Sequence, residues 1–209
     1  MNNKFLLSFL LTIGLCSAVS LAKADNPNYP NNRYPLVRKP YIELPLGSIK
    51  PKGWLLEMLE RQKKGASSQM DILYPEVMGA RNGWLGGDGD QWERGPYWID
   101  GLLPLAYILD DKELKEKSQT LIAGLEECQK KLGTGFLFGA KVEDKEDVEK
   151  QFDILEGKKK GETWVPWYNM HKVLAGLVDT YKYTGNETAL LVAEKLGDWI
   201  YARVSKWDL

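Results

Sequence analysis

Two segments of this chain follow one plan, and this repeat constrains the fold more than any other feature. The first runs from Pro96-Tyr-Trp through an apolar helical pattern to Asp110-Asp111 and a second helical pattern. The other runs from Pro166-Trp-Tyr through a similar pattern to Gly185-Asn186 and another helical pattern. Apolar residues at three- and four-residue steps predict amphipathic helices, and repeated helical hairpins build toroids or solenoids. We therefore expect an all-α fold of helical hairpins.

Local start and stop signals bound the expected helices. Proline suits a first helical position and glycine a left-handed end, so one helix is expected to begin at Pro51 and to end at Gly65. Pro104 is expected to kink its helix because proline removes a backbone donor. The expected hairpins pair residues 96–109 with 112–132 and residues 168–183 with 187–204.

Three other stretches are expected to lie outside these hairpins. Residues 41–49 alternate enough to predict an edge strand or a strap, and residues 136–138 predict a short strand inside a glycine-bounded turn. The segment from Lys141 to Glu162 is highly charged and weakly periodic. We interpret it as a solvated excursion with a short helix over 146–155, without a function.

The first 24 residues have the features of a secretory signal peptide. Lys4 supplies positive charge, residues 5–21 form an apolar run, and Ala22-Lys-Ala24 is a small-x-small cleavage signal. Cleavage would leave an exported protein, periplasmic or extracellular, without membrane contact. Lipidation at Cys16 and an uncleaved anchor are the alternatives. Residues 25–45 then form a proline- and asparagine-rich extended lead-in, and residues 46–209 the folded part.

Charge and aromatic content point to a neutral partner with flat faces. The 28 basic and 29 acidic residues nearly balance, which gives no reason to expect nucleic acid or an anionic membrane as partner. The eight Trp and ten Tyr suit either sugar rings or a packed core. The tryptophans inside helical patterns are expected in the core, namely Trp54, Trp98 and Trp199. Those on loops are expected in either role, namely Trp84, Trp92, Trp164 and Trp167.

After signal cleavage Cys128 is the only thiol, so no intramolecular disulfide is expected. Cys128 falls in a row of apolar positions on one helix face, which indicates burial. A nucleophilic or zinc-binding role is not indicated, because nothing cationic or metal-binding adjoins Cys128 in sequence.

The candidate binding residues precede the first helix of each hairpin. The run Trp164-Val-Pro-Trp-Tyr-Asn-Met-His171-Lys holds the only histidine and opens an apolar-periodic helix. Ahead of the other hairpin, a glycine-rich loop carries three carboxylates and a tryptophan. In a toroid the loops before the inner helices lie at one end, which would bring the two sets together. The candidates for binding a glycan are Asp88, Asp90, Trp92, Glu93, Trp164, Trp167, Tyr168 and His171.

The acidic loop has more than one interpretation. Hydrolysis of a glycosidic bond usually needs two carboxyl groups, and this loop could hold them. Asp-Gly-Asp equally suits helix caps, pairing with Arg94, or calcium ligation without the remaining spacing of an EF-hand. His171, likewise, could simply cap its helix or bond a neighbour.

Several segments resemble the bacterial glycoside hydrolases of family 127 and the related family 146. The similarity covers Leu46 to Trp54, Trp84 to Trp98, and Trp164 to Asn186. These enzymes are β-L-arabinofuranosidases built on an (α/α) toroid of six helical hairpins. The resemblance implies a hydrolase acting on oligosaccharides or plant-type glycans. It also implies that His171 contacts the sugar, and more loosely that the aromatics before it do.

The resemblance also implies chemistry that this sequence does not contain. In that family the nucleophile is a cysteine thiolate on zinc, with a glutamate as acid/base, all in later hairpins. No such Cys/Glu cluster occurs here, so we assign no catalytic residue and no cofactor to this chain, and expect zinc in a full-length parent. With about two hairpins instead of six, the chain is expected to be the N-terminal part of a longer hydrolase, or a truncated product, inactive alone. The alternatives are a non-catalytic glycan-binding helical protein and a calcium-stabilised helical scaffold.

Overall fold

The structure is a computed structural model that describes residues 31–32, 34–44, 46–139 and 145–207. The predicted signal peptide lies outside these residues. Within them the regular elements are helices, and no strand is formed. None of the helices in this described part is long and apolar enough to cross a membrane.

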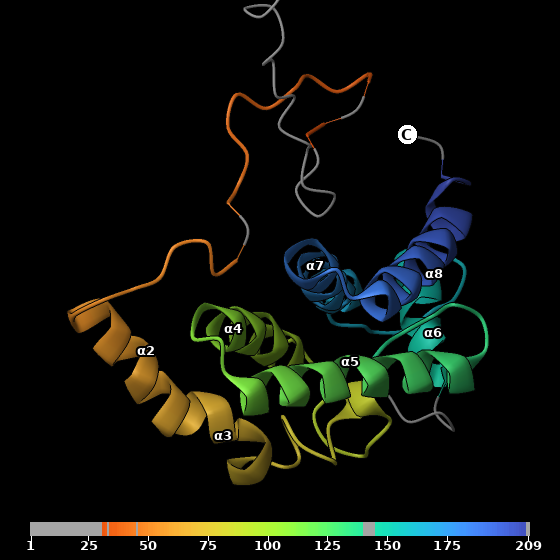
Figure 1. Ribbon diagram of the computed structural model, residues 1–209. Helices are drawn as coiled ribbons and strands as arrows, with labels where there is room; N and C mark the ends of the chain where they lie inside the picture. Colours follow the sequence, from red (N-terminus) through yellow and green to blue (C-terminus); the bar gives the residue numbers. More distant parts are fainter. Residues whose placement is uncertain (1–30, 33, 45, 140–144, 208–209) are drawn as a thin grey trace, which may run out of the picture.

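Two helical hairpins form the body of the fold. The first pairs α4 (Arg94–Ile108) with α5 (Lys112–Leu132), and the second pairs α7 (Pro166–Thr184) with α8 (Glu187–Val204). Helix α4 packs on α7 and α5 packs on α8, so the hairpins stack in two layers (Figure 1). The hydroxyls of Tyr97 and Tyr168, near the starts of α4 and α7, lie 2.9 Å apart. Helices α4 and α7 are therefore parallel, as inner helices of an (α/α) toroid are.

The predicted ends of the hairpin helices are confirmed by their caps. The Asp111 side chain accepts a hydrogen bond from the backbone N–H of Leu114 at 2.9 Å, and Asn186 does the same for Ala189 at 3.0 Å. These side chains satisfy backbone donors that a helix start leaves unpaired. Gly133 and Gly185 end α5 and α7 with φ of 79° and 72°, a left-handed conformation that glycine adopts without strain.

The core lies between the two layers. Leu102 and Ile122 of the first hairpin and Leu177 and Leu196 of the second are almost completely buried. The buried Gln129 of α5 donates its amide N–H to the carbonyls of Gly135 and Val192, at 2.8 and 3.0 Å. The bond to Val192 ties the two outer helices together, and the two bonds pair the buried amide N–H groups of Gln129.

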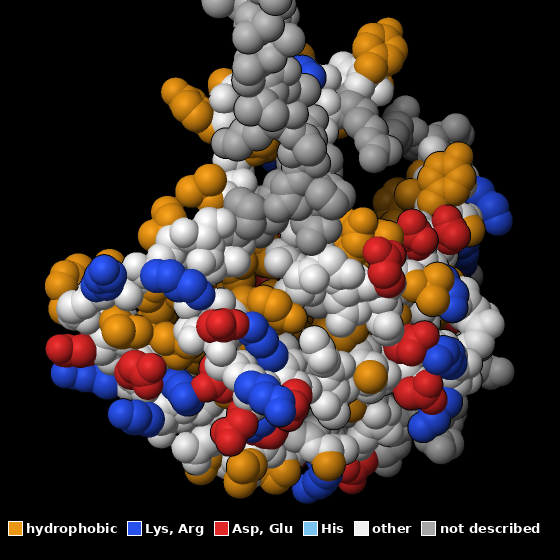
Figure 2. All heavy atoms as spheres, viewed as in Figure 1, with side chains coloured by type: hydrophobic (Ala, Val, Ile, Leu, Met, Phe, Trp, Pro, Cys, Tyr) orange, Lys and Arg blue, Asp and Glu red, His pale blue; other side chains and the backbone are white. Residues whose placement is uncertain are grey.

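Helices α2 (Trp54–Lys64) and α3 (Ala66–Leu73) lie on the far side of the first hairpin from the second (Figure 1). The predicted end at Gly65 is confirmed, but α2 begins at Trp54 rather than Pro51. The prediction of a core Trp54 was wrong, because its side chain is 67% exposed and α2 buries no residue. Hydrophobic side chains accordingly show on the surface there, among charged ones (Figure 2). No strand forms in the described part of 41–49.

The region after α5 is partly buried despite its charge. The residues of the predicted strand at 136–138 form no strand but are fully buried. Helix α6 (Lys145–Leu155) packs on α7 and buries Phe152 completely. Its ring lies 5.9 Å from Phe136, 4.8 Å from Trp167 and 5.2 Å from Trp199, between centroids. The predicted short helix over 146–155 is confirmed by α6. The interpretation as a solvated segment holds for the exposed residues 157–162 and is wrong for the face of α6 that buries Phe152.

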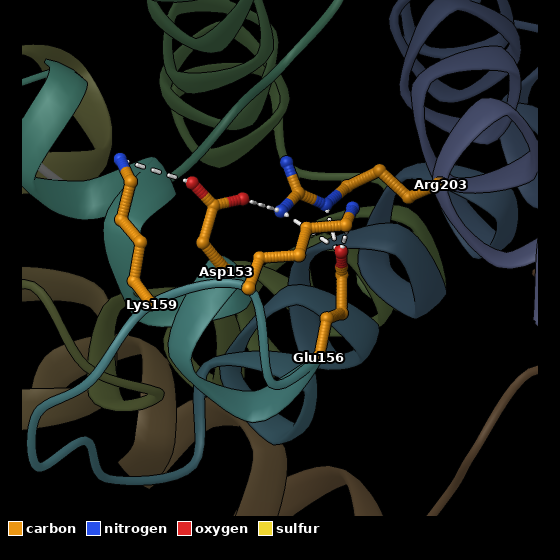
Figure 3. A network of polar contacts seen from close by, with 5 residues as sticks. Asp153, Glu156, Lys159 and Arg203 are labelled. Atoms are coloured by element: carbon orange, nitrogen blue, oxygen red, sulfur yellow. Dashed lines mark hydrogen bonds and ion pairs between the residues drawn. The ribbon is translucent and has the colours of Figure 1, made fainter.

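A polar network attaches the end of α6 to α8 (Figure 3). Arg203 Nε donates to Glu156 Oε1 at 2.7 Å, and Arg203 Nη2 donates to Asp153 Oδ1 at 2.5 Å. Lys159 lies 3.1 Å from Asp153, and Lys158 pairs with Glu156. Burial opposes ionisation, but the hydrogen bonds from Arg203 and the lysines outweigh it and lower the pKa of both carboxyls.

Candidate functional site

The loops before α4 and α7 meet at one end of the two hairpins. A cavity of about 410 Å³ opens there, lined by Trp92, Glu93, Arg94 and Trp164. Trp164 is 69% exposed, so its indole ring is free to contact a ligand. We call this end the mouth, defined by Trp92, Glu93, Trp164, Tyr168 and His171. Three of the eight residues that the sequence singled out line this cavity, namely Trp92, Glu93 and Trp164. Tyr168 and His171 lie on the first turns of α7 and contact each other.

Asp88 and Asp90 have other partners. Asp88 forms a two-point contact with Arg81, with Nε to Oδ1 at 2.9 Å and Nη2 to Oδ2 at 3.3 Å. Asp90 is buried, bonds Arg94, and accepts from the backbone N–H of Trp92 at 3.3 Å. The predicted alternative of pairing with Arg94 is thereby confirmed for Asp90. Only Glu93 of the three loop carboxylates lines the cavity.

The geometry of His171 leaves one ring nitrogen available. Its Nδ1 lies 2.8 Å from the backbone carbonyl of Tyr168, and the side chain is exposed. A carbonyl oxygen only accepts, so Nδ1 carries the proton in this bond. In the neutral ring Nε2 is then an acceptor, which suits the hydroxyl group of a sugar. No side chain caps the start of α7, so of the expected local roles for His171 the structure shows the bond to a neighbour and not the helix cap.

Tyr168 connects His171 to two residues that the sequence pattern did not single out. Its ring meets that of His171 edge-on at 5.4 Å, and its hydroxyl lies 2.9 Å from that of Tyr97. Lys172 Nζ lies over both phenol rings, 4.7 Å from the centroid of Tyr97 and 4.9 Å from that of Tyr168. The available signal was spacing, because Tyr168 and Lys172 are four residues apart on one helix face.

Trp167 and Asn169 point toward the core side of the same helix start. Trp167 packs among Phe152, Trp199 and Trp207, so packing accounts for its position. Asn169 is fully buried, and neither polar atom of its side chain has a hydrogen-bond partner within the described residues. A buried amide without partners is costly, and apolar periodicity gives no sign of one.

Two further carboxyl groups lie along the seam between α4 and α7. A Cβ placed on Gly176 would lie 4.0 Å from Asp100, so Asp100 packs where α7 has no side chain. Loss of hydration raises the pKa of Asp100, which Lys172 opposes. Loss of hydration, and then repulsion from Asp100, raise the pKa of Asp179. Both residues occupy ordinary helix positions in the sequence, where no local signal marks them.

The donor atoms of the described residues do not fit zinc. No group of three or more His, Cys, Asp and Glu side chains in the described ranges is placed to hold a metal ion. Cys128 is buried on α5, and burial raises the pKa of its thiol to about 11. Zinc sites need about four ligands, and no such group surrounds this buried thiol among the described residues. Cys128 therefore does not fit the zinc-bound thiolate that the resemblance implies.

Comparison of the chain with models of known protein families finds a match to one family. A model described as the β-L-arabinofuranosidase, GH127 catalytic domain, matches residues 50–208, which is more than half of the chain. A search of curated proteins finds no match. The matched range includes α2 through α8 and every residue of the mouth.

Proposed function

The chain belongs to the GH127 β-L-arabinofuranosidase catalytic-domain family, and from this premise we propose that its mouth binds the β-L-arabinofuranosyl groups of a plant-type glycan. The fold supports the proposal, since its all-α paired hairpins are those of an (α/α) toroid. The apolar run and Ala22-Lys-Ala24 support export to the periplasm or the extracellular space.

The observation that carries the proposal is the arrangement around His171. Its Nδ1 is engaged by the Tyr168 carbonyl at 2.8 Å, which leaves Nε2 as an acceptor at an exposed position. Trp164, which comes before Pro166 at the start of α7, is exposed and lines the cavity. A polar acceptor and a flat apolar face at one end of the fold suit a sugar, which has hydroxyl edges and C–H faces.

Non-catalytic glycan binding is the second candidate. It is favoured by the engagement of Asp88 with Arg81 and of Asp90 with Arg94, which leaves Glu93 as the one loop carboxylate at the cavity. Hydrolysis usually requires a second carboxyl group or an equivalent nucleophile. The resemblance implies a zinc-bound thiolate as that nucleophile, and the described residues offer no set of ligands that fits it.

The test measures binding and hydrolysis separately. Calorimetry with a β-L-arabinofuranosyl oligosaccharide is expected to show binding that His171→Ala weakens about ten- to a hundredfold, the equivalent of roughly 1 to 3 kcal/mol for a lost hydrogen bond. Tyr201→Ala, at an exposed position on α8, is the control and should bind normally. Release of nitrophenol from a nitrophenyl β-L-arabinofuranoside distinguishes a glycosidase from a binder. Absence of binding by the unaltered protein would contradict the proposal.

A further inference from the structure

The hydroxyl of Tyr97 meets that of Tyr168, a residue of the mouth, and one cation lies over both rings. Tyr97 itself lines a second cavity of about 460 Å³, which shares Arg94 with the cavity of the mouth. Tyr97 comes from the start of α4 and Tyr168 from the start of α7, and both are exposed, at 47% and 41%. Their hydroxyls lie 2.9 Å apart, and Lys172 Nζ covers both rings at 4.7 and 4.9 Å. The contacts of Tyr97 with Tyr168 and Lys172 join α4 to α7, and the contact of Lys172 with Tyr168 joins consecutive turns of α7. The three side chains therefore restrain each other.

Hydrogen-bond counting leaves one phenol proton unused. Each phenol has one proton, and a lysine ammonium only donates. Tyr97 and Tyr168 share one hydrogen bond, which engages one of their two protons. Tyr97 forms no other hydrogen bond to a side chain of the described residues besides those with Tyr168 and Lys172. One proton of the pair therefore remains for a ligand.

The surroundings indicate which tyrosine keeps the outward proton. Hydrogen bonds from Lys172, and then from Tyr168, lower the pKa of Tyr97. The hydrogen bond to Tyr97 is the largest cause of the raised pKa of Tyr168, as expected for the donor of the pair. Either hydroxyl can donate in the hydrogen bond between them; when Tyr168 donates, the arrangement that these pKa directions favour, the O–H of Tyr97 is the proton left over. Because those bonds polarise it, this O–H is a stronger donor than that of an isolated tyrosine.

The same contacts exclude two other roles. Lys172 occupies a face of both rings, which makes stacking of a sugar on the pair less favourable than on Trp164. Binding of an anion is opposed by the carboxylates nearby, because Glu93 and Asp100 act electrostatically on this group and offset the single positive charge of Lys172. A neutral ligand with oxygen acceptors fits the charge of the site.

We propose that Tyr97 is a sugar-contacting residue that donates a hydrogen bond to an oxygen of a neutral glycan, and that Tyr168 and Lys172 are positioning residues for it. His171 Nε2 accepts at the same end of the fold and is tied to Tyr168 by its Nδ1 bond. One donor and one acceptor together match neighbouring hydroxyl groups of a sugar. This inference rests on the proposed function, because it assumes that a glycan occupies the mouth.

The first test compares two Tyr→Phe variants of the protein. Tyr97→Phe removes only the hydroxyl and is expected to weaken binding of the β-L-arabinofuranosyl oligosaccharide about tenfold. Tyr107→Phe is the matched control, since Tyr107 also lies under a lysine, with Lys115 Nζ 4.9 Å from its ring, at the other end of α4. The control should bind as the unaltered protein does. Both variants should keep the melting temperature within a few degrees, which circular dichroism verifies.

The second test uses pH, which a purely structural role would not affect. As pH rises through the lowered pKa of Tyr97, the donor proton is lost and affinity should fall, while the raised pKa of Lys172 keeps its charge. The groups that face Tyr97 are Lys172 and Tyr168 on α7 and Glu93 before α4. Lys172→Met is expected to move the midpoint of this loss to higher pH. The ultraviolet absorbance of tyrosinate should rise over the same pH range in which affinity falls, below the range of ordinary tyrosines. This rise should be absent in Tyr97→Phe.

Three outcomes are distinguishable. If His171→Ala weakens binding and Tyr97→Phe does not, the inference about Tyr97 is wrong and the proposed function stands. If the unaltered protein binds no β-L-arabinofuranosyl oligosaccharide, the proposed function fails and this inference fails with it. If Tyr97→Phe weakens binding tenfold but the affinity of the unaltered protein does not fall as Tyr97 ionises, then the Tyr97 oxygen acts as an acceptor, and the donor role is overturned.

Discussion

Replacing Arg203 by methionine should destabilise the protein by about 3 kcal/mol. Arg203 bonds Glu156 at 2.7 Å and Asp153 at 2.5 Å, and its side chain is 13% exposed while that of Glu156 is 1% exposed (Figure 3). Removing one partner of a buried ion pair typically costs about 3 to 5 kcal/mol, because the other charge stays buried without compensation. Lys158 and Lys159 still contact the two carboxylates, which places the expected cost at the lower end.

Methionine isolates the charge from the packing. The Arg203 guanidinium lies 4.9 Å from the centroid of Trp199 and 5.6 Å from that of Phe152, so its stem also covers aromatic rings. Methionine keeps most of that cover. The measurement is urea unfolding followed by tryptophan fluorescence. Arg61→Met is the matched control, because Arg61 pairs with Glu57 on exposed α2 at 4.0 Å and should contribute less than about 0.5 kcal/mol.

The stability that Arg203 contributes should change with pH in a definite direction. The folded-state pKa values of Asp153 and Glu156 are lowered, so their stabilisation is fully present above the unfolded-state pKa values, about 4. It is lost as pH falls through the folded-state values. The difference between the unaltered protein and Arg203→Met should therefore be largest near neutral pH and shrink in acid. An unfolding free energy that Arg203→Met leaves unchanged at neutral pH would refute the reasoning.

Two further predictions concern the fold. Cys128, with its thiol pKa raised to about 11 by burial, should resist alkylation at neutral pH in the folded protein and react after unfolding; rapid labelling of native protein, measured by mass spectrometry, would contradict its buried position. Asn186→Ala should cost about 1 kcal/mol by removing the cap on the Ala189 N–H, with Asn186→Asp as a control that keeps the acceptor, both measured by urea unfolding. Equal stability of the two variants would show that the cap contributes nothing.

Much of the helical framework follows from sequence because its signals are local. Gly133 predicted the C-terminal end of α5, and Gly185-Asn186 predicted the turn between α7 and α8. The two glycines act through their own backbone, and Asn186 acts on the N–H of Ala189, three residues on. Trp54 shows the limit of such signals. The apolar pattern predicted α2 but not that this face stays exposed, because burial requires a partner surface that periodicity does not specify.

The composition of a segment likewise did not reveal its environment. The charged residues around α6 predicted solvation, yet Phe152 is completely buried and Glu156 nearly so. Their partners, Trp199 and Arg203, come from α8, and a segment's composition carries no information about a distant helix. The strand predicted at 136–138 failed for a related reason, because three buried aromatic and aliphatic side chains there serve a core between helices.

The sequence by itself determined which residues open the two inner helices, and hence that His171, Trp164 and Glu93 would be candidates at one end. Only the tertiary structure decided which of them face a ligand. Asp90 turned to Arg94 within its own loop, whereas Tyr168 met Tyr97 from 71 residues away. The packing of α4 on α7 creates that contact. A hydrogen bond between two helices depends on their relative placement, which the packing of the whole core sets.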